Sequence, residues 1–489
     1  MIDLMESEFR KDIQGLRAIA VISIFFYHLN LLNGGFLGVD IFFVISGYVI
    51  TKSILTNKKK LTFNNYIFKR LKRLFIPLFF LILLTFLIVT IIFIPHHIDH
   101  FSKSSFYSIL FVSNFYFWQN TNHYFDLDKT LQPLLHTWSL GVEMQFYIIF
   151  GLIIFAFNHK KLLFILIFLF FISLIISEAN AEREMSFWLM PFRLFEFIIG
   201  SLVFLSPKKK LNIFYETILS FLCLSFILAA LFFFNENYKF PGINALYICL
   251  VTGLLIYLNN ENLIYKTLSS SLANYIGNVS YSLYLVHWPI IVLFLYFNPA
   301  GLLFFDYILI FVISIILSII FHKYFENFDF SKFKMNTKFN FSLFIIFATT
   351  LTFILSMDFI KNLNFKYYSE NSKKLLELKN LAATQRSFFL EENTIIYEGS
   401  KRKLFNLDIN KKNILIIGDS HSEDLFAGFL QTVNSEYNIY WQHLPLECNK
   451  TILLKPDWHI TEKILFYLID RKPWTQIFYE MCSKYYQDT

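Results

Sequence analysis

Ionisable side chains embedded in apolar sequence are the residues of this chain best suited to chemistry. Arg17 and His28 lie eleven residues apart within an apolar stretch that runs from residue 13 to residue 33. On an α-helix this spacing is about three turns, so both side chains would share one face, about 16 Å apart. The pair predicts an anion-binding arginine and, deeper in the helix, an acid–base histidine. A snorkelling arginine and a histidine hydrogen-bonded within a helix bundle are the structural alternative.

Carboxylates and arginines in the neighbouring apolar runs could complete such a site. Asp40 lies in GGFLGVDIFFVISGY, where it could orient a histidine or cap the start of a helix. Arg70 and Arg73, in RLKR, share a helix face and suit phosphate, although membrane topology alone also explains such charges. Glu143 lies well inside an apolar run that follows His136, where a carboxylate without a partner is unfavourable.

Two further apolar runs carry polar residues. Arg193 and Glu196, in FRLFEF, have the i,i+3 spacing of an ion pair on one helix. His287 lies near the middle of a run, and Pro289 after it would kink the helix and leave one carbonyl without its N–H donor. Because the polar residues are spread over several runs, they predict a polar interior within a membrane domain.

Composition and charge are those of an integral membrane protein. Hydrophobic residues make up 56% of the chain, and the mean hydropathy is +0.50. The net charge of +7 comes from basic residues that cluster in short loops between apolar runs. These residues form no basic stripe with interleaved aromatic side chains, so we expect no nucleic-acid partner.

Twelve apolar runs lie between residues 13 and 360. The run at 104–118 is short, aromatic and rich in Ser and Asn, which predicts a re-entrant or interfacial segment. If the other eleven cross the membrane and the N-terminus is cytoplasmic, Lys and Arg concentrate in the inner loops. We therefore predict an α-helical polytopic membrane protein with about 11 transmembrane helices. Its main domain would be residues 1–330, followed by a linker at 331–410 that holds a last span near 341–360.

Residues 411–489 follow a different pattern, which predicts an α/β piece outside the cytoplasm. The stretch KNILIIGDSHSEDL reads as a strand, a tight turn and the start of a helix. Ser420 would lie at the helix start, where a backbone N–H can bind an oxyanion, although a plain helix cap is an alternative. Cys448 and Cys482 could pair on the oxidising side of the membrane.

Seven stretches between residues 10 and 330 occur in the order typical of one family. They resemble the acyltransferase-3 family of bacterial membrane O-acyltransferases: RAIAVISIFFYH, GGFLGVDIFFVISGY, RLKR, HTWSLGVEMQFY, FRLFEFIIG, SYSLYLVHWP and YFEN. That family commonly has two acidic residues before QFY; here the second is Met144, while Glu143 remains. The tail resembles the first block of an SGNH hydrolase domain, but the Asp and His that would complete a Ser420 site are not evident. We expect that domain to be incomplete.

The resemblance implies a multi-pass enzyme of the bacterial inner membrane. It would move an acyl group, which in this family is usually acetyl, from cytoplasmic acyl-CoA to a hydroxyl of an envelope glycan. Lipopolysaccharide O-antigen, peptidoglycan and exopolysaccharide are the implied acceptors. The resemblance implies that His28 is the catalytic base or acyl relay. The other implied catalytic residues are Asp40, Glu143 and, in the tail, Ser420. Arg17, Arg70 and Arg73 would bind the CoA phosphates.

Acyl-CoA would be a donor substrate rather than a bound cofactor. We expect membrane lipids around the chain and no metal, because metal-ligand spacing is not evident; PHHIDH, with His96, His97 and His100, lies in a predicted outer loop. Two other interpretations stay open. One is a transporter or flippase of acyl carriers or glycans, and the other is an inactive, truncated relative.

Overall fold

The computed structural model shows two compact units, residues 1–364 and 365–489. The described residues are 9–57, 61–93, 95–120, 131–207, 211–258, 262–298, 301–327, 337–356, 412–418, 437–443 and 465–468. Ser420, Cys448 and Cys482 lie outside them.

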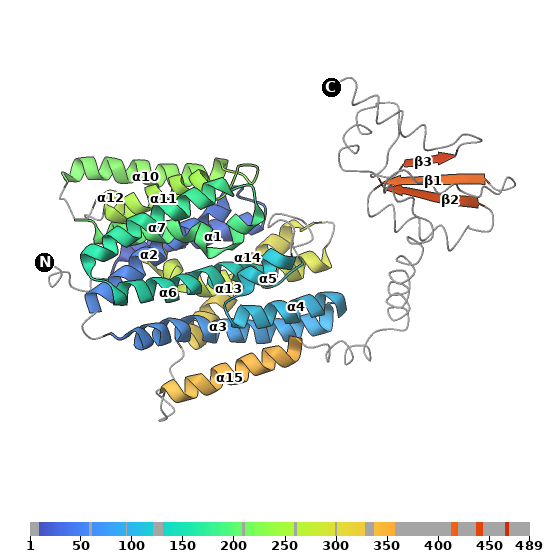
Figure 1. Ribbon diagram of the computed structural model, residues 1–489, viewed down its shortest axis with the longest axis horizontal. Coiled ribbons are helices and arrows are strands. Elements are labelled where there is room, and N and C mark those ends of the chain that lie inside the picture. Colours follow the sequence, from blue (N-terminus) through green and yellow to red (C-terminus); the bar gives the residue numbers. More distant parts are fainter. Residues whose placement is uncertain are drawn as a thin grey trace, which may run out of the picture. The chain divides into compact units, whose positions relative to one another are not determined.

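The first unit is a bundle of α-helices (Figure 1). Polar side chains cap the starts of several of them, as Thr62 does for α3 and Asn158 for α7. The helices are α1 (Lys11–His28), α2 (Gly38–Asn57), α3 (Phe63–Ile92), α4 (Pro95–Ile109), α5 (Ser113–Asn120), α6 (Trp138–Ala156), α7 (His159–Ala179), α8 (Glu184–Trp188), α9 (Met190–Leu205), α10 (Ile213–Phe233), α11 (Gly242–Tyr257), α12 (Leu263–Leu268), α13 (Ser271–Phe297), α14 (Phe304–Phe321) and α15 (Thr337–Ser356). Short helical turns are η1 (Gly35–Leu37), η3 (Leu135–Thr137) and η4 (His322–Glu326).

The helices confirm a polytopic membrane protein. Within the described residues, seven helices are long and apolar enough to cross a bilayer: α2, α3, α6, α7, α10, α13 and α14. Other helices, among them α1, α9 and α11, cover other predicted runs, so the count of eleven spans stays a prediction. The run at 104–118 does not form one continuous helix, because α4 ends at Ile109, Phe111 has a φ of 57° and α5 begins at Ser113.

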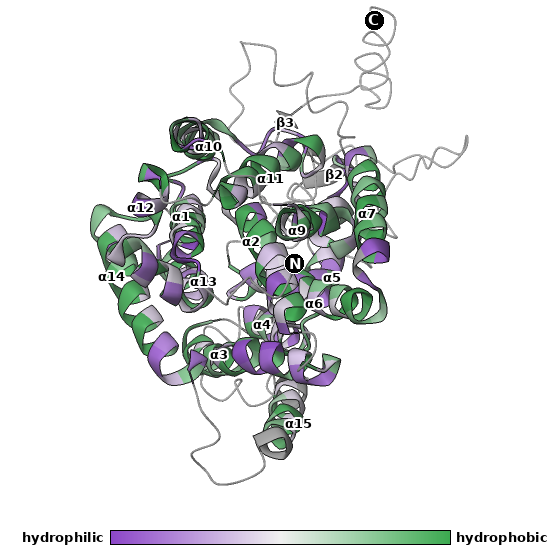
Figure 2. Cartoon of the chain, turned by 90° about the vertical axis from the view of Figure 1, so that its left-hand side faces the viewer, coloured by the Kyte–Doolittle hydropathy of each residue, from purple (hydrophilic) through white to green (hydrophobic). Residues whose placement is uncertain are grey.

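The bundle has buried inner helices and exposed outer ones (Figure 2). In α2 and α13, 72% and 78% of the apolar window is buried, against 22% in α7 and α14. The outer helices carry exposed apolar side chains such as Phe164 on α7 and Phe233 on α10. A surface of this kind is suited to contact with lipid tails.

Two glycines let the inner helices approach closely. A Cβ atom on Gly277 of α13 would lie 2.1 Å from the backbone oxygen of Gln14 on α1. A Cβ atom on Gly47 of α2 would lie 1.8 Å from the backbone oxygen of Phe197 on α9. Small residues at such crossings are typical of helix packing in membranes. They fix the pairs α1–α13 and α2–α9, and three of the predicted site residues, Arg17, His28 and Asp40, lie on these helices.

The second unit contains a three-stranded sheet of order β2-β1-β3, from β1 (Lys412–Gly418), β2 (Tyr437–His443) and β3 (Leu465–Leu468). The predicted strand before Ser420 is β1. It pairs in parallel with β2 and antiparallel with β3. A parallel pair needs a long crossover connection, and residues 419–436 are long enough to provide one. The sheet contains the predicted strand before Ser420, while an α/β arrangement of the tail and an SGNH-type fold stay predictions.

Candidate functional site

A pair of histidines lies where α1 meets α13. His28 is the last residue of α1, and its Nδ1 atom lies 2.9 Å from Nε2 of His287 on α13. The two rings are nearly parallel, with centroids 5.1 Å apart and an interplanar angle of 18°. The ring of Trp288 lies 4.5 Å from that of His28, and its Nε1 donates to the backbone oxygen of Gln132 at 2.8 Å. Trp288, fixed by this hydrogen bond, therefore packs against the His28 ring.

A third histidine is close to this pair. The ring centroid of His136, in η3, lies 5.8 Å from that of His287. The His136 ring lies near the backbone carbonyl of Leu285, but neither of its ring nitrogens has a hydrogen-bond partner among the described residues. That carbonyl lacks its usual helical donor because residue 289 is proline, as the sequence predicted. The sequence had marked His136 and His287 as polar residues in or beside apolar runs, but it gave no reason to place them beside His28.

A small pocket of about 10 Å³ adjoins His28. Its walls include the aromatic rings of Phe36, Trp138, Phe187 and Phe240. A space of this volume is about the size of one water molecule. The aromatic walls therefore leave little room beside the imidazole for anything larger than a small group.

A larger cavity of about 300 Å³ brings together four predicted site residues: Arg17, Arg70, Arg73 and Glu143. Arg17 lies three helical turns before His28 on α1, and Arg70 and Arg73 lie on α3. Three guanidinium groups against one carboxylate give this cavity a positive character. Val39 and Tyr284 line both the large cavity and the small pocket beside His28. The two spaces are therefore neighbours.

Two of the arginines already have polar partners. Arg17 Nη1 lies 3.2 Å from Oε1 of Gln14 on the same helix. Arg73 Nη2 lies 3.3 Å from Oε1 of Glu326, and the Arg73 side chain is 41% exposed. Glu326 also accepts a hydrogen bond from Ser282 Oγ at 3.0 Å. Glu326, in the YFEN stretch, was not predicted as a site residue, and local spacing gives no signal for it.

Glu143 is the carboxylate among these arginines. It accepts a hydrogen bond from Ser46 Oγ on α2 at 2.5 Å and another from the Tyr147 hydroxyl. The guanidinium of Arg70 lies 6.0 Å from the centre of the Tyr147 ring. Glu143 thus has the partners that its position inside an apolar helix requires.

Asp40 belongs to a fully buried ionic cluster, whose arginine, Arg193, also lines the small pocket beside His28. Arg193 Nη2 lies 3.1 Å from Oδ1 of Asp40, and Arg193 Nε lies 3.2 Å from Oε1 of Glu196. The predicted i,i+3 pair of Arg193 and Glu196 is confirmed. Asp40 was predicted to orient a histidine or to cap a helix; it lies in the first turn of α2 and pairs with arginine on α9.

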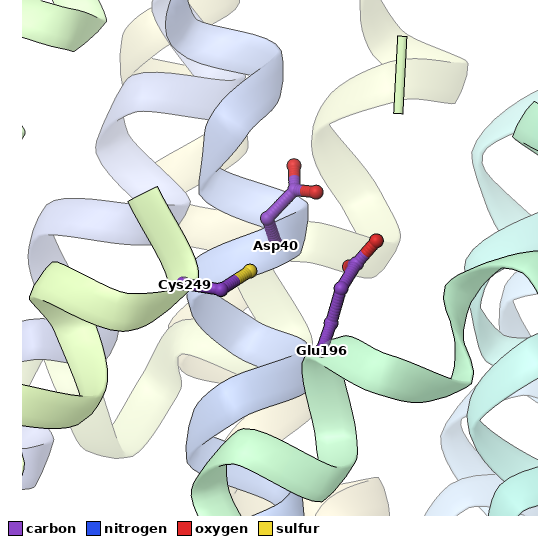
Figure 3. A group of neighbouring side chains, drawn as sticks. All are labelled: Asp40, Glu196 and Cys249. Carbon is purple, nitrogen blue, oxygen red and sulfur yellow. The ribbon is translucent and has the colours of Figure 1, made fainter. Parts of the chain in front are cut away.

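The same cluster contains side chains of types that ligate metals. The ligand atoms of Asp40, Glu196 and Cys249 lie within 4.8 Å of one another (Figure 3). However, the Arg193 guanidinium contacts both carboxylates and lies 5.1 to 5.9 Å from the centres of four aromatic rings: Phe43, Trp138, Phe187 and Phe240. Arginine thus supplies positive charge where a metal ion would bind, and we assign no metal to the cluster.

Comparison with known proteins covers the helical unit. A family profile described as an acyltransferase domain matches residues 10–323. The chain is 35% identical over 309 residues to O-acetyltransferase OatA of Staphylococcus aureus, covering 57% of this chain and 50% of that protein. It is 32% identical over 312 residues to peptidoglycan O-acetyltransferase OatA of Listeria monocytogenes, covering 58% and 49%.

A third relative is an uncharacterized protein of Haemophilus influenzae, 36% identical over 242 residues, with 46% of this chain and 98% of that protein covered. The chain thus spans about half the length of the OatA proteins that it matches. No solved structure is significantly similar to it.

Proposed function

Since the chain belongs to the acyltransferase domain family, whose profile matches residues 10–323, we propose that it is a membrane O-acyltransferase. It moves an acyl group, acetyl in the names of its relatives, from cytoplasmic acyl-CoA to a hydroxyl of a cell-envelope polysaccharide. The observation that carries the proposal is the arginine-lined cavity of about 300 Å³ next to the pocket at His28.

The cavity suits the donor. Its volume is near the lower end of what holds a drug-sized ligand, so it takes the pantetheine arm rather than the whole of acyl-CoA. Arg17, Arg70 and Arg73 then face the phosphates, for which guanidinium forks are well shaped. Glu143, held by Ser46 and Tyr147, provides an acceptor for an amide N–H of the arm.

His28 acts as the general base of the transfer. Its imidazole takes the proton of the acceptor hydroxyl while the hydroxyl oxygen bonds to the thioester carbonyl carbon. The carbon–sulfur bond then breaks, and the CoA thiolate receives that proton from the imidazolium. The ester and free CoA are the products. The thioester is already activated, so the step as proposed draws on no further cofactor.

The cellular setting follows the charge pattern of the sequence. We place the chain in the bacterial inner membrane with the N-terminus in the cytoplasm and the tail outside. One relative is named as a peptidoglycan O-acetyltransferase, which makes peptidoglycan a candidate acceptor beside lipopolysaccharide O-antigen and exopolysaccharide. Because we expect the Ser420 site of the tail to be incomplete, we assign no step of the transfer to it.

A labelled-donor assay tests the proposal. Membranes with wild-type protein or His28→Ala, at matched expression, receive acetyl-CoA labelled in the acetyl group. We expect CoA release and label in envelope glycans for wild type, and loss of both for His28→Ala. Equal transfer by the two proteins would contradict the role of His28. No transfer by wild type, together with altered export of a glycan or acyl carrier, would favour the transporter interpretation.

A further inference from the structure

We propose that His287 is a positioning residue that fixes the tautomer of His28, so that Nε2 of His28 is the basic nitrogen. This inference deepens the proposed function and rests on it for its catalytic consequence. The tautomer itself follows from the hydrogen bonds around the two rings.

The chain of hydrogen bonds begins at the backbone of α13. Nδ1 of His287 lies 2.8 Å from the carbonyl oxygen of Tyr284 and 3.1 Å from that of Leu283. A carbonyl oxygen only accepts, so Nδ1 of His287 carries the hydrogen. In the neutral ring, the lone pair of His287 is then at Nε2.

The lone pair at Nε2 of His287 determines which nitrogen of His28 carries the hydrogen. Nε2 of His287 lies 2.9 Å from Nδ1 of His28, and one of these two nitrogens must donate. Because Nε2 of His287 accepts, Nδ1 of His28 donates. The lone pair of the His28 ring is therefore at Nε2, on the other side of the imidazole.

This arrangement does for His28 what a carboxylate does in many histidine-dependent enzymes. There, a hydrogen bond from the imidazole Nδ1–H to an orienting acceptor holds the tautomer and the ring direction. Here the acceptor is a neutral imidazole, anchored to the backbone rather than charged. When Nε2 takes a proton, the Nδ1–H bond to His287 remains, so the ring keeps its direction through the reaction.

Neighbouring side chains leave the pair little freedom to rearrange. His287 is 1% exposed, and Phe25 packs edge-on against it at 5.9 Å between ring centroids. Asp40, which the sequence suggested as an orienting group, pairs with Arg193 instead. His287, at 2.9 Å from Nδ1 of His28, is thus in position to orient that ring.

Two substitutions at position 287 distinguish the orientation of His28 by a hydrogen bond from simple filling of the space. His287→Gln places an amide oxygen near the position of Nε2 and can still accept from His28, whereas His287→Phe fills the space without an acceptor. In hydrolases, loss of the tautomer-fixing group lowers kcat by about 10⁴-fold. Since the partner here is uncharged, we expect His287→Phe to lower kcat by about 100-fold or more relative to wild type. The kcat of His287→Gln should be at least about tenfold higher than that of His287→Phe.

The Michaelis constant distinguishes this role from a structural one. The KM for acetyl-CoA should stay within about twofold of wild type in both variants, because the arginine cavity is untouched. Val286→Ala, which removes buried volume from the same helix beside His287, is the packing control and should keep its kcat. If His287→Phe keeps a wild-type kcat while His28→Ala is inactive, the inference is wrong and the proposed function stands.

A spectroscopic measurement tests the tautomer without any activity. In protein labelled with ¹⁵N at its 12 histidines, the signals of His28 and His287 are assigned from their loss in His28→Gln and His287→Gln. We expect both rings to carry hydrogen at Nδ1 and a lone pair at Nε2 in the wild type. A His28 ring with hydrogen at Nε2 would overturn the inference, whatever the enzyme transfers.

Discussion

Replacing Arg193 by leucine should destabilise the helical unit strongly, because the substitution leaves two buried carboxylates without their cationic partner. The Arg193, Asp40 and Glu196 side chains are 1%, 0% and 0% exposed, and the two ion-pair distances are 3.1 and 3.2 Å. Removing one partner of a buried ion pair costs about 3–5 kcal/mol. One cation here serves two carboxylates and also contacts four aromatic rings, so we expect a loss near the upper end of that range.

The measurement is unfolding of the detergent-solubilised protein by titration with SDS, with thermal unfolding as a second readout. The triple variant Arg193→Leu, Asp40→Asn, Glu196→Gln should regain a large part of the lost stability, because no unpaired charge remains. Lys239→Gln is the matched control: it breaks an ion pair with Glu182 whose side chains are 65% and 70% exposed, and no measurable change is expected. If Arg193→Leu unfolds like this control, the cluster does not have the energetic role that its burial implies.

Three further variants test the donor cavity and the helix packing. Arg17→Gln should raise the KM for acetyl-CoA by about tenfold with a smaller effect on kcat, as measured by CoA release, and an unchanged KM would argue against a donor site there. Tyr147→Phe removes one of the hydroxyl donors to Glu143 and should lower the free energy of unfolding by about 1–3 kcal/mol, with wild-type stability as the contrary result. Gly47→Ala should destabilise the protein by several kcal/mol, roughly as overpacking does, because its Cβ would lie 1.8 Å from the Phe197 backbone oxygen; a wild-type melting temperature would show that α2 and α9 can move apart.

Local spacing predicted the features that lie on single elements. The three-turn separation of Arg17 and His28, the ion pair of Arg193 with Glu196 and the strand before Ser420 all follow from periodicity within one helix or strand. The family resemblance also came from short stretches of this kind, and the matching profile confirms it.

Local spacing in the sequence could not predict contacts between elements that are far apart along the chain. His287 is 259 residues from His28, and Arg73 is 253 residues from Glu326. Periodicity says which face of a helix is polar, but it does not say which other helix lies against that face. The close approach at Gly277 sets the neighbour of α1, and a single sequence does not reveal what a glycine touches. For the same reason the sequence offered for Asp40 only a histidine partner or a helix-start role, and it did not reveal the arginine on α9 that pairs with it.

Val39 and Tyr284 line both the large cavity and the small pocket at His28. A wall between these two spaces matters for the ion gradients that the cell maintains across its membrane. A water-filled passage through a membrane protein would let protons and ions run down their gradients. On the proposed function, a wall at this valine and this tyrosine would avoid such a passage, because a small acyl group could pass by local side-chain motion while the bulky, charged remainder of its carrier stays behind. On the proposed function, the protein would export acetyl groups without dissipating the ion gradients across the membrane.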